Sequence, residues 1–409
     1  MISPQVHRAL YRYSIKHFLK KKKINSKKAA EEYGIDLSEE LGYSRLLDRL
    51  MDEGKVSVGE VDKFLHQEFN YGRMKNVYIS KIAPNDKLNI DEYVISCVGG
   101  LSNQGYTADH FLISSGNFIG DYKRSIPEGQ KVLLYFEIKR EGESTKSIHL
   151  LFAENAIDPN GHKTINYIPV EIRLDYSFLV IRLRNWGSNE NEDNNNLNTM
   201  HNLIRAEIVS LFGLRIISNS TSEQKIVFNV LSDLTNSVLN PTISVVNDAL
   251  KADIENDITK WSEALFDSNI IPDADREVIV QQVLYAFYKL HLFQSFGGST
   301  ITKLIQLGIE GYPRYVKFLD DTVGEGRARS SNPKESLLDT SIFYDIKARL
   351  DQAKSIRLST VYWITAPGYK RLGTSFHTFA HNQFKCVILP NFFNEGISEY
   401  VLQKVKKYS

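Results

Sequence analysis

The stretch KVLLYFEIKREGESTKSIHLLF, residues 131–152, decides the fold of the middle of the chain. Val132, Leu134, Phe136 and Ile138 occupy alternate positions in its first half, and apolar side chains repeat that alternation in its second half. A period of two is typical of β-strands, and the polar segment at residues 141–143 is typical of a turn. The stretch therefore predicts a β-hairpin.

The same period extends the predicted sheet toward the C-terminus. Apolar residues alternate over 168–174 and again over 178–183, on either side of a turn at residues 175–177. Consecutive strands that are joined by short turns pair most simply in an antiparallel manner. We therefore expect an antiparallel β domain over residues 76–185, in the form of a meander or an open barrel.

Helical patterns flank this β domain. Residues 1–72 contain short amphipathic segments and a capping box at Ser57 and Glu60, which predict a small helical module of the helix-turn-helix type. Residues 199–321 have a helical period, and the helix from Ala274 is apolar on more than one side, as in the core of a bundle. Residues 336–409 mix both patterns and predict a small mixed α/β cap.

One segment has no apolar period. Residues 186–198 consist almost entirely of Gly, Ser, Asn, Glu and Asp, and so predict a flexible linker. The sequence as a whole predicts a multidomain α+β protein. Its parts are an N-terminal helical module, a central antiparallel sheet, and a C-terminal helical bundle with a mixed cap.

The composition indicates a folded protein of the cell interior. Hydrophobic residues make up 42% of the chain and charged residues 24%, which is ordinary for globular proteins. No apolar run approaches the roughly 18 to 20 residues that cross a bilayer. Two cysteines do not form a disulfide framework. We therefore expect a cytoplasmic protein that does not contact membranes.

The net charge of +1 conceals a strong asymmetry at the N-terminus, where no acidic residue precedes Glu31. Basic residues recur there every three or four positions, so they would line one side of a helix. Such a stripe attracts a polyanion, and lysines contact phosphates without reading base sequence. The alternative is a solvated face that only keeps the protein soluble. The residues expected to contact a DNA or RNA backbone are Arg8, Arg12, Lys16, Lys20, Lys21, Lys22, Lys23, Lys27 and Lys28.

A second basic segment lies near the C-terminal third of the chain. Residues 324–329 read GEGRAR, a composition that is typical of a loop. We expect Arg327 and Arg329 to be available for a phosphate contact.

A separate hypothesis rests on Asp121, Glu137 and Lys139. A strand places Glu137 and Lys139 on one face, with Asp121 upstream across a turn. This arrangement resembles the core of the PD-(D/E)xK nucleases. The resemblance implies that the two carboxylates hold magnesium and that the lysine positions the attacking water. No other cofactor or metal is predicted. The alternative is a charged, solvent-exposed edge hairpin.

Three functional hypotheses follow. The first is a nucleic-acid-associated accessory protein of a prokaryote or mobile element, for example in antiviral defence, that binds phosphates through its N-terminal helix and a protein partner through its larger domains. The second is the metal-dependent nuclease. The third is an interaction scaffold that does not contact nucleic acid. The sequence alone predicts neither an enzyme class nor an oligomeric state.

Overall fold

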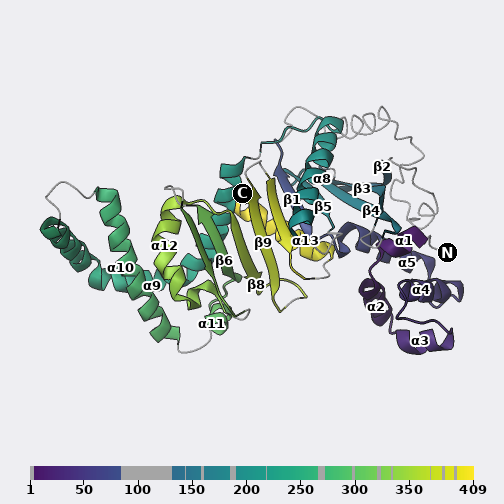
Figure 1. Ribbon diagram of the computed structural model, residues 1–409, viewed down its shortest axis with the longest axis horizontal. Coiled ribbons are helices and arrows are strands. Elements are labelled where there is room, and N and C mark those ends of the chain that lie inside the picture. The colour runs from purple at the N-terminus through teal and green to yellow at the C-terminus, as the bar shows by residue number, and fades with distance from the viewer. Residues whose placement is uncertain are drawn as a thin grey trace. The chain divides into compact units, whose positions relative to one another are not determined.

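The computed structural model divides the chain into two compact units. The first unit comprises residues 1–218 and 391–399, and the second comprises residues 219–390 and 400–409. Both units combine helices with antiparallel strands, so the protein is α+β (Figure 1). The described residues are 4–83, 131–142, 144–157, 161–184, 190–217, 219–265, 272–296, 300–319, 324–332, 335–368, 370–379, 383–390 and 394–409.

The first unit begins with short helices, as the sequence predicts. The capping box at Ser57 and Glu60 is present, and Gly34 and Gly54 take positive φ angles of 63° and 68° just beyond two of the helices. These helices are α1 (Pro4–Ala9), α2 (Arg12–Lys21), α3 (Ser26–Glu32), α4 (Gly42–Asp52) and α5 (Val58–Gln67), followed by a π-helical turn at Glu68–Gly72.

An antiparallel sheet with the order β2-β3-β4-β5-β1 follows the helices. The predicted hairpin and meander are confirmed, because β2 pairs with β3, β3 with β4, and β4 with β5. The strands are β1 (Asn76–Lys81), β2 (Lys131–Glu141), β3 (Ser144–Ile157), β4 (Lys163–Arg173) and β5 (Phe178–Leu183).

The helical module and the sheet belong to one compact unit, which differs from the predicted boundary at residues 72–76. Helix α1 contacts β4, and the ring of Phe69 stacks on that of Tyr167 with 3.8 Å between centroids. Both of these aromatic side chains are buried. The helical module and the sheet therefore share part of one hydrophobic core.

The segment expected to be a linker is helical over most of its length. Helix α8 (Glu190–Leu211) begins within it. Leu197 is 5% exposed and joins the core with Ile204 and Ile208, so a helical spacing of apolar residues starts inside the polar stretch. This helix packs on one face of the sheet, and tertiary packing stabilises it despite its polar first turns.

The strands of the second unit pair in an antiparallel manner, in the order β10-β9-β8-β6-β7. Residues 311–319, which lie at the end of the predicted helical domain of residues 199–321, form the strand β6. The strands are β6 (Gly311–Leu319), β7 (Glu325–Arg329), β8 (Leu358–Trp363), β9 (Leu372–Phe379) and β10 (Gln383–Ile388).

Helices α9 and α12 contact these strands. The helices are α9 (Ser220–Leu265), α10 (Asp273–Phe296), α11 (Thr300–Gln306), α12 (Ser341–Ala353) and α13 (Glu395–Tyr408), the last of which belongs to the second unit from Tyr400 onward.

Within the described residues, every helix is too short or too polar to cross a membrane.

Candidate functional site

Helices α2 and α3 carry a cluster of exposed basic side chains. Ile15 and Leu19 of α2 are buried together with Ser14, which turns the basic positions of the helix toward solvent. Asn25 caps α3 by accepting hydrogen bonds from the backbone amides of Lys27 and Lys28. We call the exposed set the α2–α3 cationic surface: Arg12, Lys16, Lys20, Lys21, Lys22, Lys23, Lys27 and Lys28.

Arg8, the ninth predicted cation, lies elsewhere. It belongs to α1, and its guanidinium donates a hydrogen bond to the backbone carbonyl of Lys163 over 3.3 Å. Its half-buried side chain ties α1 to the sheet. We therefore do not count it in the α2–α3 cationic surface.

Most of this surface has no acidic partner among the residues that the structure describes. The ammonium of Lys22 forms an ion pair with Glu60, while Arg12 lies over the rings of Tyr13 and Tyr43 at 5.7 and 5.8 Å from their centroids. Within the part of the chain that the structure describes, no carboxylate lies within 4.0 Å of the six remaining lysines. The positive charge is therefore left to solvent or to a ligand.

Two pKa shifts reflect this concentration of charge. Partial burial lowers the pKa of His17, and the neighbouring ammonium groups of Lys21 and Lys20 lower it further. The hydrogen bond from Lys22 lowers the pKa of Glu60 to about 2, with help from Ser57. Burial and the nearby ammonium groups both favour the neutral form of the His17 imidazole.

The structure places Glu137 and Lys139 on one face of β2, as predicted. Their neighbours, however, are not those that a metal site requires. Glu137 lies opposite His149 of β3, and the ammonium of Lys139 forms an ion pair with Glu395 of α13. Asp121 lies outside the described residues, so the nuclease hypothesis stays a prediction. Among the described residues, no three His, Cys, Asp or Glu side chains come together as a metal site.

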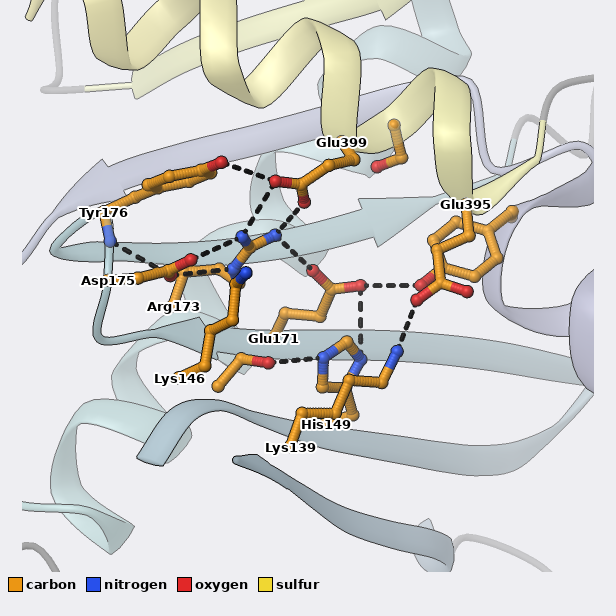
Figure 2. A network of polar contacts seen from close by, with 12 residues as sticks. Lys139, Lys146, His149, Glu171, Arg173, Asp175, Tyr176, Glu395 and Glu399 are labelled. Carbon is orange, nitrogen blue, oxygen red and sulfur yellow. Dashed lines mark hydrogen bonds and ion pairs between the residues drawn. The ribbon is translucent and has the colours of Figure 1, made fainter. Parts of the chain in front are cut away.

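The same sheet face carries a network of buried polar side chains (Figure 2). At its centre Glu171 of β4 accepts hydrogen bonds from Arg182 over 2.8 Å and from Tyr71 over 3.2 Å. Arg182, which is fully buried, also donates to the hydroxyl of Ser398 on α13 over 2.6 Å. Arg173 pairs with Asp175 and with Glu399 of α13. The network fastens the start of α13 to the sheet.

Three members of the network form a serine–histidine–carboxylate chain. The hydroxyl of Ser147 lies 2.8 Å from Nε2 of His149, whose Nδ1 lies 3.4 Å from Glu171. Hydrolases use such a chain when the serine can reach a substrate. Ser147 is 2% exposed, and Arg182 already neutralises Glu171. In this arrangement the three side chains satisfy one another's buried polar groups, and Ser147 is not presented as a nucleophile.

The pKa shifts of the network fit a stabilising role. Burial raises the pKa of Glu171, but the charge and the hydrogen bond of Arg182, together with the charge of Arg173, more than offset it, and the resulting pKa lies well below the ordinary value. Burial lowers the pKa of His149 despite the nearby Glu171. At neutral pH the centre is therefore an ionised carboxylate held by arginines beside a neutral imidazole.

Arg327 and Arg329 lie on a strand and not on the predicted loop. Both side chains are exposed on β7, where Arg327 lies opposite Lys317 and Arg329 opposite Tyr315 of β6. Between them, Ala328 is buried. At Gly326 the ring of Phe318 packs on the backbone of the strand, where a Cβ would lie 2.3 Å from that ring. The structure thus adds an aromatic neighbour, Tyr315, to Arg329.

Comparison with known proteins adds no information on function: no family model, curated protein or solved structure matches the chain. The assignment of a role to each residue rests on geometry and charge.

Proposed function

We propose that the protein binds nucleic acid by placing the phosphate backbone against the α2–α3 cationic surface. The observation that carries this proposal is the exposure of six lysines without an acidic partner among the described residues, on two consecutive helices and the turn between them. The rest of the chain carries more acidic than basic residues, so this surface is the local exception. A concentrated positive charge attracts polyanions and speeds their association.

The dimensions suit several phosphates at once. Helix α2 has 10 residues, which corresponds to roughly 15 Å at 1.5 Å per residue. One strand of a duplex presents about four phosphates over that axial length, because its phosphates follow one another about every 3.4 Å along the helix axis. Lysines act as point charges, so we expect affinity with little preference for sequence.

The salt dependence of binding tests the proposal. We expect the affinity of the full chain for a 20-base-pair DNA or RNA duplex to fall by at least about tenfold between 50 and 200 mM salt, because bound phosphates release their counterions. Fluorescence anisotropy with a labelled duplex measures this. An affinity that does not change over that range would show that the surface is only a solvated face.

The predicted protein partner and the accessory role, for example in antiviral defence, stay predictions. One observation bears on the partner. Ile279, Phe287, Leu290 and Phe293 of α10, expected in a bundle core, are 38% to 56% exposed, because the helix buries its other side through Leu284 and Tyr288. Apolar side chains exposed along one helix are common at protein interfaces.

A further inference from the structure

The second unit's sheet has one buried face and one partly open face at strands β6, β7 and β8. Along β8 the side chains alternate, with Ser359, Val361 and Trp363 buried and Leu358, Thr360 and Tyr362 half-buried. The same alternation occurs along β7, and along β6 from Tyr315 onward. Because directly paired residues share a face, Tyr315, Arg329 and Thr360 lie side by side on the open one.

A pocket lies on this open face. Its volume is about 290 Å³, at the small end of ligand pockets, which hold roughly 300 to 1,000 Å³. We call it the arginine–tyrosine pocket, and it is lined by Arg314, Tyr315, Arg329, Thr360, Tyr362 and Leu389. All of these residues belong to the second unit.

Arg314 reaches the pocket because β6 is irregular at that position. Pro313 pairs with Val361 and Tyr315 pairs with Thr360, so Arg314 is an extra residue without a partner on β8. Its guanidinium lies 5.6 Å from the ring centroid of Tyr362 and 3.4 Å from the hydroxyl. Bulges of this kind re-aim a side chain, and they are frequent beside functional sites.

No carboxylate of the described residues forms an ion pair with the arginines of the pocket. Arg314 and Arg329 have no carboxylate within 4.0 Å among the described residues. In the first unit, by contrast, Arg173 and Arg182 are each held by carboxylates. The Nε of Arg314 is also buried without a hydrogen-bond partner in the described part of the chain. Two guanidinium groups at one small pocket therefore favour an anion that accepts several hydrogen bonds.

We propose that the arginine–tyrosine pocket binds one nucleotide unit, with its phosphate held by Arg314 and Arg329 and its base against a tyrosine ring. Guanidinium groups match phosphate oxygens in geometry, and tyrosine rings stack on bases of any sequence. Tyr362 is itself supported by Tyr312, whose ring is nearly parallel at 15° and 5.8 Å away. The site goes beyond the proposed function, because it uses no residue of the α2–α3 cationic surface.

Calorimetric titration of the full chain with AMP, adenosine and inorganic phosphate tests this site. We expect AMP to bind at least tenfold more tightly than adenosine, which lacks the phosphate, and than phosphate, which lacks the base. Arg314→Gln and Arg329→Gln should each weaken AMP binding at least tenfold. Tyr315→Leu should weaken AMP but not phosphate. Arg357→Gln, which removes an exposed arginine outside the pocket, is the matched control.

Competition with a ten-nucleotide single strand, with and without a 5′-phosphate, separates a strand end from a free nucleotide as the source. Binding of AMP that is unaffected by either arginine substitution, in variants with unchanged circular dichroism, would overturn the proposal. So would equal affinity for AMP and phosphate. Replacement of the α2–α3 lysines should leave AMP binding unchanged, so a failure of the proposed function is distinguishable from a failure of this site.

Discussion

Replacing Lys16, Lys20, Lys21 and Lys27 together by glutamine should weaken binding to a duplex by at least about thirtyfold at 100 mM salt. Each lysine is exposed and has no acidic partner among the described residues. Every phosphate contact that is lost also removes about 0.9 from the slope of log affinity against log salt. Glutamine has a helix propensity close to that of lysine, so α2 and α3 should remain folded. Anisotropy titrations of both proteins measure the change.

A charge-matched variant controls for the general loss of positive charge. Its four lysines are exposed but lie outside the α2–α3 cationic surface: Lys63, Lys225, Lys260 and Lys406. We expect its affinity to stay within about threefold of the parent, because contacts and not net charge dominate. The single change Lys22→Gln should also cost less than Lys21→Gln, because Glu60 already holds Lys22. Equal losses in both four-lysine variants would contradict a localised site.

The largest expected effect on stability comes from Arg182→Met. Arg182 is fully buried, and its removal leaves the carboxylate of Glu171 buried without its nearest charge partner. Breaking a buried pair in this way costs about 3 to 5 kcal/mol in the free energy of unfolding. Urea denaturation followed by circular dichroism measures the loss, and amide exchange in β4 and β5 assigns it to the first unit.

Two further variants make this stability prediction specific. The double variant Arg182→Met, Glu171→Met should recover part of the loss, since an apolar pair replaces the ionic one. Arg276→Met, which breaks the exposed ion pair with Asp273, should cost less than about 1 kcal/mol. A double variant that is no more stable than Arg182→Met alone would show that packing, and not the stranded charge, accounts for the loss.

The network should also make the first unit sensitive to acid. The folded-state pKa values of Glu171 and His149 both lie below their ordinary values of 4.5 and 6.5, so the folded protein binds fewer protons than the unfolded chain. Stability is therefore present above these ordinary values and is lost as the pH falls below 6.5 and then below 4.5. Urea midpoints that decrease from pH 7 to pH 4 are the expected result.

Local patterns allowed part of the fold to be predicted from the sequence. The hairpin at residues 131–152 and the capping box at Ser57 depend on neighbours within a few residues, and both are confirmed. Strand β7 could not be predicted from its own residues, because glycine is typical of a loop. The contact between Gly326 and the ring of Phe318, eight residues away, exists only in the folded structure. The first turns of helix α8 were predicted to be a linker, because they are polar. Leu197, which follows these turns, nevertheless packs in the core.

The candidate sites differ in how well they can be predicted from the sequence. The α2–α3 cationic surface is contiguous in sequence, so charge spacing was enough to predict it. The polar network was not predictable, because Arg182 meets Ser398, 216 residues away, only through the fold. Arg314 and Tyr362 belong to the pocket only through strand pairing and an irregular register. An alternation of aromatic and basic residues along β6 was the available signal.

Lysine footprinting tests most directly whether phosphates meet the protein at α2 and α3. The full chain is acetylated with an amine-reactive ester, with and without a saturating 20-base-pair duplex, and modification is quantified by mass spectrometry. We predict that the duplex protects Lys16, Lys20, Lys21, Lys23, Lys27 and Lys28 severalfold, while Lys63, Lys225, Lys260 and Lys406 react as before. Unchanged modification of the α2–α3 lysines under saturation would contradict the proposed function.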